Sequence, residues 1–195
     1  MNDFARLLEG YLHAKDDHLP HLIDGIFAPD ARLTFALATQ NIAFPSRADG
    51  AAAIARTLVT DFGAQCHRCR TYCVVRRGDL PEAPRAGNGP VSLAPMPWLV
   101  VMQARAGGAL RVGHGRYRWT FDRVGDDWRV SDLHIDIARM DVVDDACADA
   151  WRAAIQQALP YPWVDAPVLR AAVARLVAGD AGLGWLAAFG EPAGA

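Results

Sequence analysis

Cysteine and histidine are concentrated in one short segment, in a pattern that raises the question of metal or redox chemistry. Cys66, His67, Cys69 and Cys73 contain one Cys-x-x-Cys spacing. A structural zinc site needs a second pair of ligands, and a thioredoxin-like site needs a strand that leads into a helix. The sequence offers neither around this segment. We therefore expect no metal and no cofactor.

Histidine and aspartate also alternate along one predicted strand near the end of the sheet. His134 and Asp136 are two residues apart, so both side chains lie on one face of an extended strand. Pairing aromatic with aliphatic residues across the preceding hairpin brings the arginines of that strand, Arg116 and Arg118, opposite His134 and Asp136. The group is either a ligand contact or a structural ion-pair cluster. We expect Arg116, His134 and Asp136, with Trp119 on the other face, to bind a substrate.

The elements that must position these residues follow from hydrophobic periodicity. Helical spacing of apolar residues predicts helices over residues 3–15, 17–27 and 49–63. Extended apolar patterns predict strands over residues 33–37, 41–44, 69–75, 98–105, 111–123 and 128–140. Residues 76–97 form a connection with five prolines and three glycines. A connection of this length is either a mobile flap or disorder.

The final predicted strands form a hairpin, and helices follow it. Residues 124–127 carry a Gly-Asp turn, and a bulge is expected near Ser131. After residue 141 the pattern becomes helical, with Trp151, Ile155 and Leu159 at four-residue steps. We divide the chain into a domain of residues 1–141 and a C-terminal helical extension of residues 142–195. The extension is expected to pack on the same domain or on a partner subunit.

Composition restricts the possible partners of the protein. The 195 residues carry a net charge of −2, which disfavours nucleic acid and anionic membranes as partners. Lys15 is the only lysine among the twenty basic residues, and we give the arginine excess no functional weight. Apolar runs such as residues 98–102 are too short for a transmembrane helix. Without a secretory signal, and with three clustered cysteines, the protein is expected in the cytoplasm.

The order of the elements resembles the nuclear transport factor 2 (NTF2)-like superfamily and, within it, the SnoaL-like proteins. The matching segments cover residues 1–140. They are Tyr11 to Asp16, Phe27-Ala28-Pro29-Asp30-Ala31, Gly50 with Ile54, Gly115-Arg116-Tyr117 and Asp127-Trp128-Arg129-Val130. The resemblance implies an α+β fold in which three N-terminal helices pack on a strongly curved antiparallel sheet. It also implies a cone-shaped barrel with a deep apolar pocket, commonly in a homodimer.

The resemblance also implies site residues. Dehydratase members place a tyrosine and an aspartate near the end of the first helix and a histidine after the third, which Tyr11, Asp16 and His67 match. Asp16 would be the base, His67 its partner and Tyr11 the acid. Burial is expected to raise the pKa of Asp16. Alternatively, Tyr11 is a core residue, Asp16 or Asp17 caps the second helix, and His67 is an exposed residue at a helix end.

Two functional hypotheses follow from this resemblance. The first is binding of a small, apolar, oxygen-bearing molecule, with dehydration, isomerisation or cyclisation by acid–base chemistry and no cofactor. The second is a non-catalytic ligand-binding or structural module, including the small subunit of an aromatic-ring dioxygenase. The fold alone does not separate them, because one scaffold hosts many functions.

Overall fold

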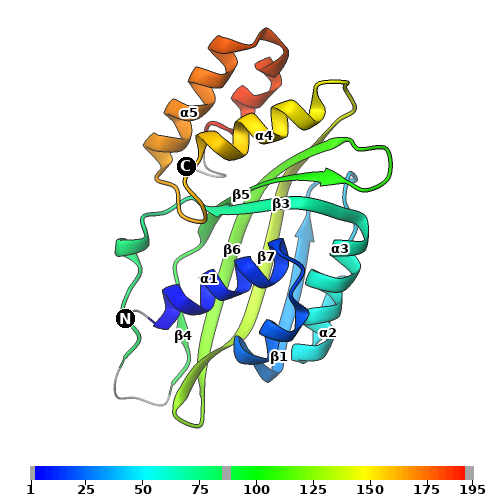
Figure 1. Ribbon diagram of the computed structural model, residues 1–195. Coiled ribbons are helices and arrows are strands. Elements are labelled where there is room, and N and C mark those ends of the chain that lie inside the picture. The colour runs from blue at the N-terminus through cyan, green and yellow to red at the C-terminus, as the bar shows by residue number, and fades with distance from the viewer. Residues whose placement is uncertain (1–2, 85–88, 192–195) are drawn as a thin grey trace.

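The computed structural model describes residues 3–84 and 89–191, which form a curved sheet with helices on both faces (Figure 1). The helices are α1 (Asp3–Asp16), α2 (Ala51–Ala55), α3 (Phe62–Gln65), α4 (Ala148–Ala158) and α5 (Ala166–Gly179). A π-helical segment, Arg56–Asp61, joins α2 to α3, and 3-10 helices lie at Pro20–Gly25, Arg77–Asp79 and Ala181–Phe189. None of the helices in the described parts of the chain is long and apolar enough to cross a membrane.

The sheet has seven strands, and its edges do not meet. The strands are β1 (Phe27–Leu37), β2 (Arg47–Asp49), β3 (Cys66–Cys73), β4 (Val91–Ser92), β5 (Met96–Ala104), β6 (Leu110–Val124) and β7 (Asp127–Val143). They follow the order β2-β1-β7-β6-β5-β3, with β4 added beside β6. β1 runs parallel to β7 while the other pairs are antiparallel, so the sheet is mixed. The expected α+β fold class is confirmed.

The predicted hairpin register is confirmed. Tyr117 lies opposite Ile135 and Arg118 opposite His134, so one face of the hairpin is apolar and the other is charged. The pairing shifts at Ser131, which is the expected bulge. A second shift follows His114. Here a Cβ on Gly115 would lie 1.8 Å from the Asp136 carbonyl oxygen, so only glycine permits the close approach at which the sheet bends.

The second predicted helix is wrong in length. Only the 3-10 helix Pro20–Gly25 forms, and Phe27 already pairs with β7. The backbone N–H of Val130 donates to the Ile26 carbonyl, so hydrogen bonds to the sheet replace the helical ones that the apolar spacing suggested. Asp17 does not cap this helix, because its carboxylate pairs with Arg70 and His13.

Two other sequence expectations differ from the structure. Residues 41–44 form no strand; instead Ile42 and Phe44 pack on the core from an irregular loop. The connection 76–97 is partly regular: it holds a 3-10 helix and β4, and Leu80, Ala83 and Val91 pack against the core. Its residues 85–88 lie outside the described residues, so the choice between a flap and disorder is not tested there.

Two apolar clusters lie on opposite faces of the sheet because side chains alternate along each strand. The concave cluster joins α1 and the helical segments of residues 51–65 to inward side chains such as Trp98, Val100 and Met102. The convex cluster joins α4, α5 and the last 3-10 helix to the intervening side chains Tyr72, Leu99 and Val101. Whether residues 1–141 and 142–195 are separate domains stays a prediction.

Candidate functional site

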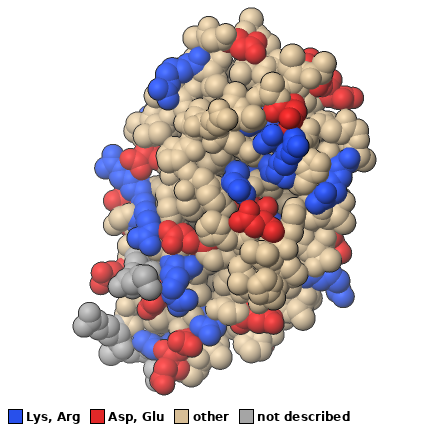
Figure 2. All heavy atoms as spheres, viewed as in Figure 1, with Lys and Arg blue, Asp and Glu red and all other residues tan. Residues whose placement is uncertain are grey.

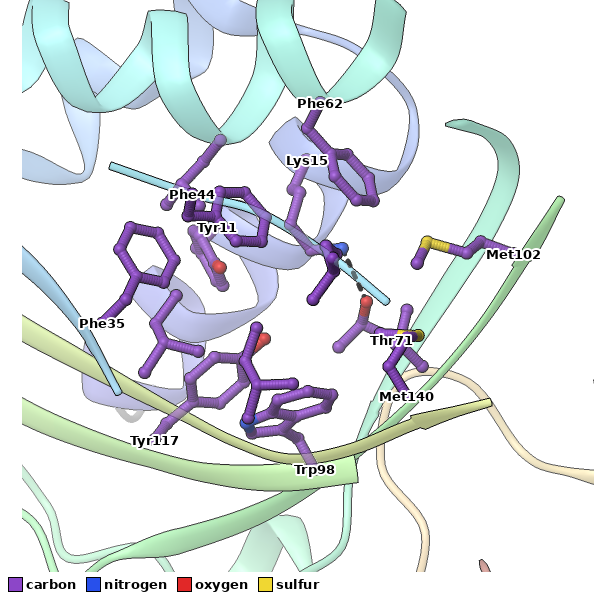
Figure 3. Close-up of a pocket in the computed structure, with 15 residues that line it drawn as sticks. Tyr11, Lys15, Phe35, Phe44, Phe62, Thr71, Trp98, Met102, Tyr117 and Met140 are labelled. Carbon is purple, nitrogen blue, oxygen red and sulfur yellow. Dashed lines mark hydrogen bonds between the residues drawn. The ribbon is translucent and has the colours of Figure 1, made fainter. Parts of the chain in front are cut away.

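A cavity remains inside the concave cluster, between α1, the helical segments of residues 51–65 and the sheet (Figure 3). Its wall is mainly apolar and includes Phe35, Phe44, Phe62, Met102 and Met140. The space between these side chains is about 410 Å³ when its mouth is counted, whereas the centre of a water-sized sphere can occupy about 40 Å³. A ligand larger than a few atoms must therefore displace wall side chains.

α1 supplies the cavity with two polar side chains. Tyr11 and Lys15 are four residues apart, so both project from the same face of the helix toward the sheet. Alternation along the strands brings three further polar groups to the wall: the Thr71 hydroxyl from β3, the Trp98 indole from β5 and the Tyr117 hydroxyl from β6. The cavity thus has hydrogen-bond donors in an apolar surrounding.

The Tyr11 hydroxyl is fully buried. The neighbouring Tyr117 hydroxyl interacts with it, but among the described residues no hydrogen bond of standard geometry satisfies it. The Tyr117 ring meets the Tyr11 ring edge-on at 5.9 Å, and Figure 3 shows both hydroxyl groups turned toward the cavity. Burial raises the pKa of Tyr11 to about 12. The phenol therefore stays protonated at neutral pH and can donate to an acceptor in the cavity.

Lys15 and Asp16 form a buried ion pair at the β3 side of the cavity. Lys15 Nζ donates to Asp16 Oδ1 at 2.6 Å and to Thr71 Oγ1 at 2.7 Å. The two side chains expose 7% and 0% of their surface. Burial opposes the charge of Lys15, but the Asp16 carboxylate outweighs it and raises the pKa of the ammonium group. Lys15 is therefore a fixed positive charge beside the cavity.

The carboxylate of Asp16 is saturated with donors, and it does not line the cavity. Besides Lys15 it accepts hydrogen bonds from the Thr71 backbone N–H at 2.6 Å, the Cys69 thiol at 3.2 Å and the Tyr161 hydroxyl at 3.2 Å. The expected rise of its pKa is wrong. Burial does oppose the charge, but Lys15 and the other donors outweigh burial, so the pKa of Asp16 is lowered.

His67 lies away from the cavity, in an open polar groove between β3, the end of α1 and α4. Its Nε2 is 3.1 Å from Gln103 Oε1, and its Nδ1 is 3.5 Å from a guanidinium nitrogen of Arg105. Arg70 pairs with Asp17 along the same groove at 2.9 Å. Figure 2 shows side chains of both charges interleaved on this face. Asp16 also lines this groove, but no hydrogen bond joins it to His67 among the described residues, so the expected pair stays a prediction.

The four expected substrate-binding residues also lie outside the cavity wall. His134 and Asp136 alternate with the cavity residues Ile135 and Ile137, so they point from the opposite face of the sheet. His134 contacts Thr34 at 2.7 Å and Asp136 at 3.1 Å, and Arg118 pairs with Asp136 at 2.9 Å. These contacts pair the side chains with one another on the charged face of the sheet, and their role in binding a substrate stays a prediction.

Arg116 and Trp119 occupy the two faces of β6. Arg116 lies opposite Asp136, on the charged face, as the sequence register predicted. Trp119 is buried on the concave side, and its ring centroid is 5.1 Å from that of Tyr11. Trp119 therefore supports Tyr11 from behind without lining the cavity.

Sequence reasoning missed Lys15, Thr71 and Tyr117 as polar groups of the cavity. Lys15 carried a signal: it is the only lysine of the chain and lies one helical turn after Tyr11 on the apolar face of α1. Thr71 and Tyr117 are ordinary members of alternating strands, so nothing local distinguished them. Within residues 3–84 and 89–191, no group of three His, Cys, Asp or Glu side chains could hold a metal ion.

The chain is similar to solved structures at low sequence identity. No protein-family model and no curated protein sequence matches it. The hexachlorocyclohexane dehydrochlorinase LinA-type3 from Novosphingobium barchaimii LL02 superposes with a TM-score of 0.57 at 14% identity, over 72% of this chain and 88% of that chain. An NTF2-like superfamily protein from Salmonella enterica serovar Typhimurium LT2 gives 0.54 at 17% identity, over 70% and 89%. These identities establish a common fold and assign no ligand.

Proposed function

Starting from the NTF2-like fold that this chain shares with those structures, we propose that the protein binds a small, largely apolar molecule through one of its oxygen atoms. The molecule occupies the cavity between α1 and the sheet. Its carbonyl or phenolic oxygen accepts hydrogen bonds from the Tyr11 hydroxyl and lies near the charge of Lys15. Its apolar body contacts the aromatic and aliphatic wall.

The observation that carries this proposal is the buried hydroxyl of Tyr11, which no hydrogen bond of standard geometry satisfies among the described residues. A buried polar group without a partner costs about 1–3 kcal/mol, and natural proteins seldom retain one without a reason. The Tyr11 hydroxyl faces a space lined by apolar side chains, in which a ligand oxygen would be its natural partner. Binding would recover the lost hydrogen bond and bury apolar surface at the same time.

The electrostatics of the cavity favour an oxygen that gains negative charge. Asp16 holds Lys15 protonated, so Lys15 supplies a positive charge beside the cavity, and Tyr11 stays neutral and can donate a hydrogen bond. Donors fixed in an apolar cavity stabilise an enolate or phenolate more strongly than water-exposed donors do. Asp16 is then a positioning residue, which holds Lys15 in place and keeps it charged.

A lyase, isomerase or cyclase reaction remains the proposed class of chemistry. The name of the similar dehydrochlorinase supports proton-transfer chemistry as the class to test. Such a reaction also needs a base, and the described wall of the cavity holds neither a carboxylate nor an imidazole. The two candidate bases that the sequence suggested, Asp16 and His67, lie outside the wall, so binding and polarisation of the oxygen form the core of the proposal.

The proposal is tested with 4-nitrophenol, whose absorbance distinguishes the phenol from the phenolate. We expect saturable binding and a shift of the bound probe toward the phenolate. Tyr11→Phe should weaken binding about tenfold, which corresponds to about 1.4 kcal/mol. Tyr72→Phe is the matched control, because the Tyr72 hydroxyl is also buried and unpaired but belongs to the convex cluster. Absence of saturable binding, or equal losses in both variants, would overturn the proposal.

We also propose that the protein is a cytoplasmic homodimer, as the resemblance in sequence suggested. The three buried cysteines are free thiols, in keeping with a reducing compartment. Light scattering at micromolar concentration tests the assembly: a mass of two chains is expected, and a mass of one chain would contradict it.

A further inference from the structure

A second hollow adjoins the cavity and widens toward the surface. It lies between the loop of residues 42–45, the helical segments of residues 57–65 and the start of β6. The two hollows share Ile42, Phe44 and Phe62 as wall residues, so these side chains lie between them. The centre of a water-sized sphere can occupy about 150 Å³ in this outer hollow. We call it the vestibule.

Arg111 gives the vestibule a cationic group that the rest of the fold does not use. Arg111 lies opposite Met102 across β5 and β6, so its side chain projects beside a residue of the cavity wall. Its Nε is buried and has no hydrogen-bond partner among the described residues. Within residues 3–84 and 89–191, no carboxylate oxygen lies within 4.0 Å of a nitrogen of the Arg111 guanidinium group. Asp61 lines the same hollow but forms no ion pair with Arg111.

The charge balance of the vestibule indicates what Arg111 could hold. A partly buried guanidinium without a partner loses hydration and gains no ion pair, so an anion at this place would be stabilised. The only charged wall residues of the described vestibule are Arg111 and Asp61. One cation beside one carboxylate suits a monoanion better than a doubly charged phosphate group. The planar guanidinium also matches a carboxylate in two-point hydrogen bonding.

We propose that the ligand of the cavity carries a carboxylate at the end opposite its polarised oxygen, and that Arg111 binds this carboxylate in the vestibule. The inference rests on the proposed function, because it extends the same ligand through the shared wall. The ring centroid of Phe44 lies 4.5 Å from that of Phe35, on which it stacks, and 6.5 Å from that of Phe62. Aromatic rings therefore flank the boundary between the two hollows. An apolar spacer between the oxygen and the carboxylate would cross there.

The test compares two probes that differ only in charge. 3-(4-Hydroxyphenyl)propanoate carries a carboxylate, and 3-(4-hydroxyphenyl)propanamide replaces it with a neutral amide of the same shape. We expect the wild type to bind the carboxylate at least about tenfold more tightly than the amide. Arg111→Gln should bring this ratio close to one and leave the affinity for the amide unchanged. The ratio should also fall as salt is raised.

Two control variants make the result specific. Arg118→Gln removes an arginine from the same strand, on the opposite face of the sheet, and should leave the ratio unchanged. Arg111→Lys keeps the positive charge but lacks the planar guanidinium group, so it should keep part of the preference for the carboxylate over the amide. This variant keeps the proposal testable even if Arg111→Gln does not fold. Equal affinity of the wild type for both probes, while 4-nitrophenol binding still depends on Tyr11, would overturn the role of Arg111 alone. Binding of neither phenol would overturn the proposed function itself.

Discussion

The two apolar clusters of this protein are built from alternate residues of the same strands, yet they differ in what they bury. The convex cluster, under α4 and α5, contains apolar and aromatic side chains. The concave side contains a cavity and, among the described residues, the only buried charged side chains, Lys15 and Asp16. Burying an ion pair seldom adds stability over apolar packing.

The difference between the two faces indicates that one face of the sheet serves packing and that the other is suited to function. On the convex side, the C-terminal helices cover the strands and, among the described residues, leave no buried charged side chain, although the Tyr72 hydroxyl is buried there without a partner. On the concave side, α1 presents a charge and an unpaired phenol to a space that apolar residues could have filled. Departures from good packing of this kind are expected at functional sites. This contrast supports the proposal that a ligand binds on the concave side.

The largest effect on stability is expected when the buried ion pair of Lys15 and Asp16 on the concave side is broken. Lys15→Met leaves the Asp16 carboxylate buried without its countercharge, so the free energy of unfolding should fall by about 3–5 kcal/mol. Urea denaturation measures this. The double variant Lys15→Met/Asp16→Asn leaves no buried charge and should recover more than half of the loss. A loss below about 1 kcal/mol in the single variant would mean that the pair is not buried as described.

The next largest effect is expected when a leucine is shortened to alanine in one cluster or the other, because only the concave cluster contains the cavity. Leu186→Ala empties part of the convex cluster, where the side chain is fully buried, and should lower the free energy of unfolding by about 2–4 kcal/mol. It should not change the affinity for 4-nitrophenol. Leu58→Ala, in the cavity wall, is the matched change and should alter that affinity. If Leu186→Ala changed binding as much as Leu58→Ala, the two faces would not be functionally distinct.

A smaller effect concerns acid stability. The folded pKa of Asp16 is lowered, so its carboxylate stabilises the fold above the unfolded pKa of about 4, and this contribution is lost as the pH falls through the folded pKa. The stability advantage of the wild type over Asp16→Asn should therefore shrink on acidification below about pH 4. Urea denaturation across this range measures the difference. An advantage that grows as the pH falls would mean that the folded pKa is raised.

Parts of this contrast could be predicted from the sequence. The hairpin register and the bulge at Ser131 follow from strict alternation of aromatic and polar residues, which leaves one register with a dry face. The four-residue spacing of Trp151, Ile155 and Leu159 predicts the first of the C-terminal helices. The second helix was not predictable, because backbone pairing of Ile26 and Phe27 with β7 depends on a strand more than a hundred residues away.

The site was predicted less well than the fold, for a related reason. Tyr11 was placed correctly on the inner face of α1. The chemistry of Asp16 depends on Thr71 and Tyr161, which approach it only in the folded chain. The local sequence could not show that hydrogen-bond donors surround the Asp16 carboxylate. Nor could it show that the neighbouring Lys15, and not Asp16, lines the cavity. The adjacent Lys15, together with donors from distant parts of the chain such as Thr71, therefore reverses the expected direction of the pKa shift of Asp16.

The most direct measurement is a crystal structure of the protein with 4-bromophenol, in which anomalous scattering locates the bromine. We expect the bromine inside the cavity among the aromatic wall residues, with the phenolic oxygen within hydrogen-bond distance of the Tyr11 hydroxyl. Bromine bound only in the polar groove beside His67, or on the convex face, would contradict the assignment of the ligand site to the concave side.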